Sequence, residues 1–402
     1  MEDKILERFY NRYDRYNTKV LKTLGETVKK FNNVDYMEAV IIAQGLDQAV
    51  IVDLLVELEA INALTMKDIN EYLDIRTAGR INYHKEHFEY RGTQPDKYIF
   101  KEITDKYKRQ ILSNLPRSNS IGFVTENEYG SKIYRGLGDT YQSLIDKAVN
   151  SVALGNEGYQ SAMRKVLNGL ADSGVKVHEE KLTYPSGRNI RIDSMVKQSI
   201  LDGYREYQNE IDKEIGKQIG ADGVEIDIHL MCAEDHEEIQ MRRFSNEQFE
   251  QLQTNGEAED MDGDLVDITR TTKKGKTYFR PIGQLNCGHR ANPIISDVDK
   301  PLYTKKQVAE INRQNRKQYE YEGKKYTKYE ASQEQRRLET AIRRQKDRQI
   351  VSKASDDIKG VAKAQKKIGE LTSRYNEFSK SMDLPNYRER MSVSGYKRMS
   401  VK

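Results

Sequence analysis

The chain has no tryptophan and only two cysteines, Cys232 and Cys287, among its 402 residues. Two cysteines cannot build the disulfide framework that holds small secreted domains together. The sequence also has no P-loop, no glycine-rich dinucleotide loop and no serine-hydrolase elbow. Standard nucleotide-binding and serine-hydrolase sites are therefore not expected.

Long apolar runs are missing as well. The N-terminal sequence MEDKILERFYNRYDRY is charged and lacks the apolar stretch of a signal peptide. The most apolar segment, residues 40–58, is too short and too polar to span a bilayer, and we expect a buried helix pair there. Its polar interruptions are Gln44, Asp47, Gln48 and Asp53. These features predict a protein that is made in a cytoplasm, stays soluble and has no membrane contact.

Charge and tyrosine are abundant. Charged residues make up 32% of the chain, mean hydropathy is −0.84, and there are 25 tyrosines. This balance favours long amphipathic helices with wide solvated faces. Residues 221–267 carry 15 Asp and Glu against two Arg, or about −13, whereas residues 305–348 carry about +7. The acidic middle and the basic tail are expected to have different neighbours.

The pattern predicts a predominantly helical α+β fold. We expect an N-terminal helical region over 1–125, a helical connector over 126–174, a central α+β domain over 175–303 and a basic helical tail over 304–402. Within the first region, Asn62 to Thr65 are expected to interrupt the helices, and the prolines and glycine of residues 93–125 indicate a connecting loop.

The central domain has the clearest local signals. Two extended runs flank Pro185-Ser186-Gly187, which suits a tight turn. A long helix ending at Gly220 follows, with apolar residues every three or four positions, and residues 224–229 alternate as a strand. A second hairpin is expected over 265–282, turning at Lys273-Lys274-Gly275. The helical stripe consists of Val196, Ile200, Tyr204, Tyr207, Ile211 and Ile215.

The tail combines basic residues with tyrosines and a narrow apolar stripe. Leu338, Ala341 and Ile342 form too thin a stripe to fold alone, so we expect a partner surface, then another helix to about Lys380 and a loose basic end. Its cations are candidates for binding phosphates or an acidic protein face, although an ordinary charged helix is an equal alternative. They are Arg313, Arg316, Lys317, Lys324, Lys325, Lys328, Arg336, Arg337, Arg343 and Arg344.

Cysteine and histidine recur in two short motifs, CAEDH at 232–236 and NCGH at 286–289. Cys232, His236, Cys287 and His289 suit a Cys2His2 zinc site, but their spacing is not typical, and we favour a metal-free structural cluster. His236 and His289 also suggest a metal-dependent nuclease as the alternative function. Pro293 and Pro301 stand where that nuclease needs a helix.

The order of these blocks resembles one known family. The runs SGVKVHEEKLTYPSGRNIRIDSMVKQSILDGYREYQNEI, GADGVEIDIHLMCAEDHEEIQMRRFS and LNCGHRANPIISDVDKPLY are similar to the phage minor capsid protein 2 family. That family is related to the Mu F-like head morphogenesis proteins, and the resemblance extends over roughly the last 230 residues. The residues at its motif positions are His229, His236, Gln240, Asn286, Cys287 and His289.

The resemblance implies a structural protein, not an enzyme, without a cofactor. It implies a location in the phage head, at the portal vertex or the capsid interior, and a role in head morphogenesis. The expected partners are the portal protein, the major capsid protein or scaffold, and packaged double-stranded DNA. Cys232 joins the family's motif residues in the expected structural cluster.

Overall fold

A computed structural model describes residues 2–126, 131–178, 190–229, 232, 236–271, 275–283 and 287–398. The fold is predominantly helical with small antiparallel sheets, which confirms the predicted class. The chain divides into two compact units. Unit 1 comprises residues 1–67, 115–198 and 334–402, and unit 2 comprises residues 68–114 and 199–333. Independent folding of residues 175–303 stays a prediction.

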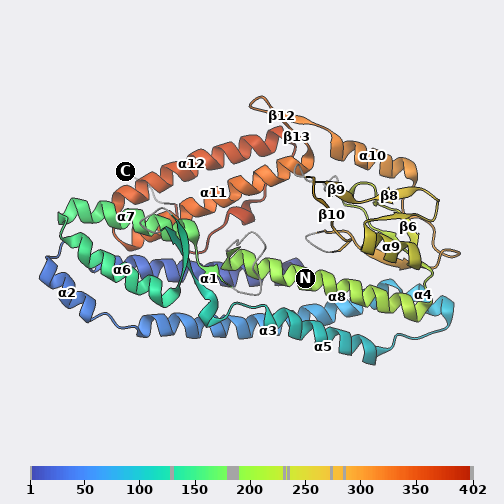
Figure 1. Cartoon of the computed structure of the whole chain (residues 1–402), viewed down its shortest axis with the longest axis horizontal. Coiled ribbons are helices and arrows are strands. Elements are labelled where there is room, and N and C mark those ends of the chain that lie inside the picture. Colours follow the sequence, from blue (N-terminus) through green and yellow to red (C-terminus); the bar gives the residue numbers. More distant parts are fainter. Residues whose placement is uncertain are drawn as a thin grey trace. The chain divides into compact units, whose positions relative to one another are not determined.

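Unit 1 is built mainly from helices, with one four-stranded antiparallel sheet of order β2-β1-β3-β4 (Figure 1). Three helices, α3 (Ala49–Tyr83), α8 (Ile192–Ile219) and α11 (Lys328–Ala354), belong in part to each unit. The other elements of unit 1 are α1 (Glu2–Lys29), α2 (Tyr36–Gln44), η1 (Ser118–Ser120), β1 (Ile121–Glu126), β2 (Lys132–Gly136), α6 (Leu137–Val152), α7 (Gly155–Ser173), β3 (Lys176–Val177), β4 (Ile190–Arg191), α12 (Ile358–Ser381) and η3 (Arg388–Met391).

Helix α1 supplies the centre of the unit 1 core. Its buried side chains recur every three or four residues, which draws one apolar stripe along the helix. Gly25 lets α11 approach closely, because a Cβ there would lie 2.7 Å from Ala354 Cβ. The Tyr13 hydroxyl on this stripe donates to Asn62 Oδ1 at 2.6 Å, whereas the buried Tyr16 hydroxyl has no hydrogen-bond partner within the described residues. The stripe consists of Ile5, Phe9, Tyr13, Tyr16, Val20 and Leu24.

A buried ion cluster lies in the same unit. Arg191 donates to Asp193 Oδ1 at 2.9 Å and to Asp14 Oδ1 at 3.3 Å, and it also binds Asp347. Arg343 binds Asp193 and lies 3.4 Å from Asp14. The three carboxylates are at most 2% exposed. Three acids face two guanidinium groups, so the formal charge of the five side chains is −1 when all are ionised.

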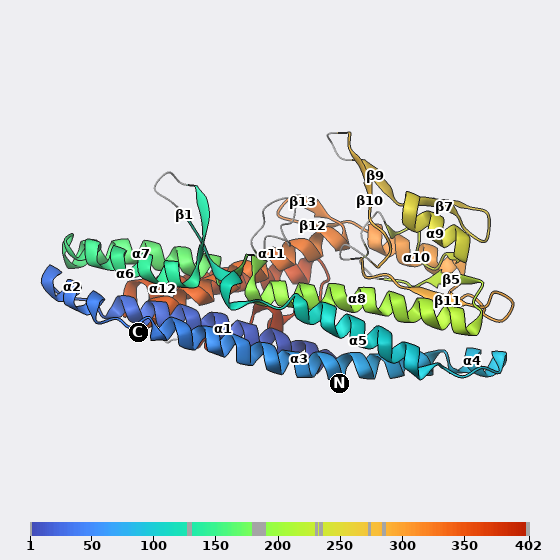
Figure 2. The ribbon, with the colours of Figure 1, turned by 60° about the horizontal axis from the view of Figure 1, so that its bottom comes forward.

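Unit 2 carries the small sheets. One has the order β11-β5-β6, and the hairpins β7-β8, β9-β10 and β12-β13 form two-stranded sheets of their own. The β9-β10 hairpin extends from this β-rich part (Figure 2). Apart from the three shared helices, the elements of unit 2 are α4 (Lys85–Arg91), α5 (Lys97–Ser113), β5 (Gly223–Ile226), β6 (Arg243–Ser245), α9 (Asn246–Asn255), β7 (Glu257–Glu259), β8 (Leu265–Asp267), β9 (Thr269–Thr271), β10 (Thr277–Phe279), β11 (Ala291–Ile294), α10 (Lys305–Arg316), β12 (Tyr319–Tyr321) and β13 (Lys324–Tyr326).

Both expected hairpins of the central segment are present. Strand β3 pairs with β4 in antiparallel register, and β9 pairs with β10 through Tyr278 opposite Arg270. The turn residues Pro185-Ser186-Gly187 and Lys273-Lys274 lie outside the described residues. The expected helix is α8, which is followed by Gly220 with a φ of 62°, a left-handed conformation that glycine adopts without strain.

Two expectations for the N-terminal region are wrong. Helix α3 continues through residues 62–65, because Asn62 bonds through its side chain to Tyr13 and to the Pro116 carbonyl and leaves the backbone helical. Residues 93–125 contain α5 in place of a loop. Pro95 precedes the cap residue Asp96 of α5, and Pro116 follows the helix, so the prolines mark the ends of a helix.

The connector and the tail also differ from expectation. Strands β1 and β2, at residues 121–126 and 132–136, pair in antiparallel register before helices α6 and α7 begin. The tail holds the β12-β13 hairpin, and its expected second helix is α12. Residues 391–394 of the expected loose end are held in place, because Met391 and Val393 are buried, and Ser394 N donates to Asp14 Oδ2 at 2.6 Å. Leu338 and Ile342 are buried as well, so the thin stripe finds its partner surface within unit 1.

The expected buried helix pair at residues 40–58 is only half buried. Ile51, Leu54 and Leu58 are buried, but Val52 and Val56 on the other face of α3 are 57% and 59% exposed. No single helix of the described residues has the length and apolar composition to cross a membrane. Helices α2 and α3 meet those criteria only together, and they are bent by 47° at the break between them.

Candidate functional site

The structure brings one residue of the first cysteine–histidine motif and two of the second together in unit 2. Donor atoms of His236, Cys287 and His289 all lie within 4.8 Å of one another, and the three residues are buried. His236 Nδ1 is 3.1 Å from Cys287 Sγ, and His289 Nδ1 is 3.5 Å from the same sulfur. Cys232 is also buried but is not part of this group.

Burial sets the protonation of the cluster. The pKa of His289 is lowered to about 3, first by burial and then by the positive charge of His229, His236 and Arg280 nearby. Burial raises the pKa of the Cys287 thiol. Both shifts favour the neutral forms, so at neutral pH His289 is an uncharged imidazole and Cys287 an uncharged thiol unless a cation is bound.

The other motif residues fasten this region to helix α10. Gln240 accepts from His229 N at 2.6 Å and donates to Asn312 Oδ1 at 2.8 Å. His229 Nε2 lies 2.6 Å from the Gly288 carbonyl, although the His229 side chain is 43% exposed. Asn315 donates to Cys232 Sγ at 3.6 Å. Asn286 lies outside the described residues.

Asn312 and Asn315 were not foreseen as part of the site. They lie three residues apart on one face of α10, and Asn312 Nδ2 also donates to the Glu237 carbonyl. The sequence does show two amide side chains at helical spacing within a charged segment, which indicates that they share a helix face. It does not show which residues they would bond to. Arg316 binds the nearly buried Glu237 carboxylate at 2.5 Å, so this cation is structural.

The basic residues of the tail fall into separate groups. Lys317, Lys324 and Lys325 are exposed around the β12-β13 hairpin, and Lys328 Nζ lies 4.5 Å from the ring centre of Tyr319. We call these four lysines and Tyr319, Tyr321 and Tyr326 the Lys-Tyr hairpin. Lys317 also stacks on Tyr319, and Lys324 on Tyr326, at 5.0 and 4.7 Å.

The remaining cations differ in exposure. Arg336, Arg337 and Arg344 are exposed on α11, and Arg337 pairs with Glu334. Arg313 pairs with Glu310 at 2.8 Å. Arg343 belongs to the buried ion cluster, which removes it from the surface that the sequence suggested.

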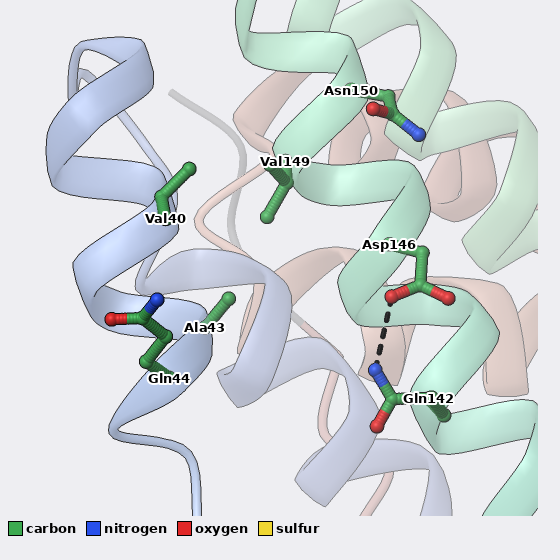
Figure 3. Close-up of a pocket in the computed structure, with 7 residues that line it drawn as sticks. All are labelled: Val40, Ala43, Gln44, Gln142, Asp146, Val149 and Asn150. Atoms are coloured by element: carbon green, nitrogen blue, oxygen red, sulfur yellow. Dashed lines mark hydrogen bonds between the residues drawn. The ribbon is translucent and has the colours of Figure 1, made fainter.

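A further surface feature lies on unit 1 between α2 and α6. A groove of about 560 Å³ lies there. Figure 3 shows its lining side chains, among which Gln142 donates to Asp146 at 2.9 Å. Beside it, Met37 and Ile41 of α2 are 66% and 64% exposed. The groove is lined by Val40, Ala43, Gln44, Gln142, Asp146, Val149 and Asn150.

Comparison with known proteins settles the family. The sequence matches the family model described as Phage minor capsid protein 2 over residues 119–380, which is well over half of the chain. The chain belongs to the phage minor capsid protein 2 family. No curated protein and no solved structure matches the chain.

Membership of the phage minor capsid protein 2 family gives the chain a structural role in a phage head and an association with the virion. The match begins in the β1 region and ends in α12, so it includes the cysteine–histidine cluster and the Lys-Tyr hairpin. These two features are therefore properties of the capsid-related part of the chain.

Proposed function

We propose that the chain is a low-copy protein of the portal vertex or capsid interior that acts in head morphogenesis and touches the packaged DNA. The observation that carries this proposal is the Lys-Tyr hairpin. Lys324 and Lys325 are exposed at its tip and have no ion pair within the described part of the chain. Clustered ammonium groups next to tyrosine rings neutralise phosphates and pack against the nucleic acid.

The DNA contact is tested by the salt dependence of binding. In the triple variant K317E/K324E/K325E, three phosphate contacts are lost, so the slope of log K against log salt should flatten by about 2.7 on duplex DNA. The measurement is a fluorescence anisotropy titration of the purified chain with a labelled duplex at several salt concentrations. The charge-matched control is K97E/K106E/K213E, which changes three exposed lysines elsewhere in unit 2.

The control should keep the wild-type slope and affinity. Equal slopes for the wild type and the hairpin variant would rule out the hairpin as the DNA contact. An unchanged slope on DNA together with lost binding to head proteins in the hairpin variant would instead assign the hairpin to an acidic protein face.

A second surface supports a role in assembly. Residues 31–66 carry six Asp and Glu and no Lys or Arg. Within this segment, Ile41, Val52 and Val56 are exposed on α2 and α3. Exposed apolar side chains among acidic residues match an amphipathic helix with basic flanks, and we propose that the portal protein supplies this helix.

The variant I41D/V56D tests this contact, because both side chains are exposed and neither contributes to the core. We expect at least a tenfold loss of incorporation into heads with unchanged thermal stability. The matched control L265D/L302D alters two exposed leucines of unit 2 and should incorporate normally. Crosslinking within heads identifies the partner. Normal incorporation of I41D/V56D, or crosslinks from this face only to the major capsid protein or scaffold, would refute a portal contact.

The metal-dependent nuclease receives less support. A nuclease must bring its metal and general base to a phosphodiester, which requires an open site. His236 is fully buried and His289 is 4% exposed, and both face the sulfur of Cys287. This burial favours a structural cluster, in agreement with the family.

A further inference from the structure

We propose that His236, Cys287 and His289 bind one zinc ion, which holds the β-rich part of unit 2 together. The proposal concerns a site that membership of a capsid family does not assign, and it is independent of the DNA and portal contacts. It rests on the distances between three donor atoms, on the hydrogen bond between His236 and the Arg280 carbonyl, and on the small core around the cluster.

The distances suit a tetrahedral ion. A tetrahedral zinc with Zn–S of about 2.3 Å and Zn–N of about 2.0–2.1 Å places sulfur and nitrogen ligands about 3.5 Å apart. In the structure the two Nδ1–Sγ distances are 3.1 and 3.5 Å. Only small movements of the side chains are needed to close the three donors on one ion.

The surroundings orient His236 as a ligand. Its Nε2 lies 2.8 Å from the carbonyl oxygen of Arg280, and a carbonyl can only accept, so Nε2 carries the proton. The Nδ1 atom therefore directs its lone pair at the Cys287 sulfur. A backbone carbonyl that fixes the tautomer in this way is typical of metal-bound histidines.

His289 provides the second imidazole. Its Nε2 is buried and has no hydrogen-bond partner. Without an ion, the thiol of Cys287 has one hydrogen for two ring nitrogens, so the other ring must carry its own proton on Nδ1. That tautomer leaves His289 Nε2 as a buried acceptor without a donor. An ion lets both Nδ1 atoms present lone pairs to the cluster at once, because it needs no proton, and His289 Nε2 then carries the ring proton.

The ligand chemistry selects zinc among common cations. One thiolate and two imidazoles form a soft-to-borderline set, which suits Zn²⁺ and excludes Mg²⁺ and Ca²⁺ with their oxygen preference. Three protein ligands leave one tetrahedral position for a small molecule such as water. The burial of all three ligands indicates a structural ion.

The core of this region is small, so a bound ion would add to its stability. Five of its nine buried residues lie on short strands or one short helix, and the other four, Cys287 among them, lie in turns and connecting segments. Small cores are commonly stabilised by disulfides or metals, and this chain has no disulfide. The proposed ion ties residue 236 to residues 287–289. The core consists of Ile226, Ile239, Phe244, Leu252, Ala258, Val266, Ile268, Ile282 and Cys287.

The experiment measures metal in the purified full-length chain, expressed with zinc in the medium, by inductively coupled plasma mass spectrometry. We expect about one zinc per chain in the wild type and at least a tenfold loss in C287S and H289A. The matched control is C232S, which removes the other buried cysteine but not a ligand and should retain zinc.

A second measurement avoids the question of whether the variants fold. Cobalt is loaded into the wild-type chain after chelation, and the thiolate-to-cobalt charge-transfer absorption is recorded. The proposal predicts this absorption for the wild type and for C232S. A wild-type chain without stoichiometric zinc, zinc retained in C287S, or cobalt binding without a thiolate signal would each overturn the proposal.

Discussion

Replacing Asp193 by Asn should lower the free energy of unfolding by about 3–5 kcal/mol, because it breaks a buried ion cluster from one side. Asp193 is fully buried and is bound by both Arg191 and Arg343. Although burial opposes ionisation, these two guanidinium groups hold the pKa of Asp193 below its usual range. Chemical denaturation of the full-length chain near neutral pH measures the loss.

The matched control for this variant is D347N in the same cluster. Asp347 is also fully buried, but it is the third acid facing two cations. Its replacement removes the excess negative charge and keeps an oxygen that accepts from Arg191. D347N should therefore cost far less than D193N at pH 7 or stabilise the protein. Equal losses for the two variants would contradict the assigned roles of the two carboxylates.

Asp347 should also make stability depend on pH. Burial and the Asp14 carboxylate raise its pKa from 3.8 to about 6, against the opposing effect of Arg191 and Arg343. Since the folded pKa is above the unfolded value, its contribution is fully present below about pH 3.8 and is lost as pH rises through about 6. The loss amounts to at most about 3 kcal/mol.

The measurement compares the wild type with D347N by denaturant unfolding from pH 4 to pH 8. The wild type should lose stability relative to D347N across this range, with most of the change below about pH 6.5. The contribution of Asp193 to stability has the opposite pH dependence, because its lowered pKa adds stability that is lost as pH falls. Parallel curves of unfolding free energy against pH for the wild type and D347N would show that the pKa of Asp347 is not raised in the folded protein.

Local patterns predicted much of the fold. The apolar stripe of α8, the pairing of β3 with β4 and that of β9 with β10 follow from helical spacing, alternation and turn residues close together in the chain. Helix α5 was missed because Pro95 and Pro116 were taken as signs of a loop, although proline is common just outside helix ends.

The site was only partly predictable. The motif predicted that His236, Cys287 and His289 gather, although about fifty residues separate the two halves. It gave no reason to leave Cys232 out of the group, because that depends on the path of the backbone. The ion cluster could not be foreseen, since Asp14, Arg191 and Arg343 come from distant segments and look like ordinary surface charges in sequence.

The central claim is that the chain is a structural component of a phage head. Quantitative mass spectrometry of purified, DNA-filled particles tests it most directly, with tail-only fractions from the same lysate for comparison. The account predicts the chain in the heads at a small fraction of the copy number of the major capsid protein, and its absence from the tail-only fractions. Particles that package DNA normally and contain none of the chain at any stage of assembly would contradict it.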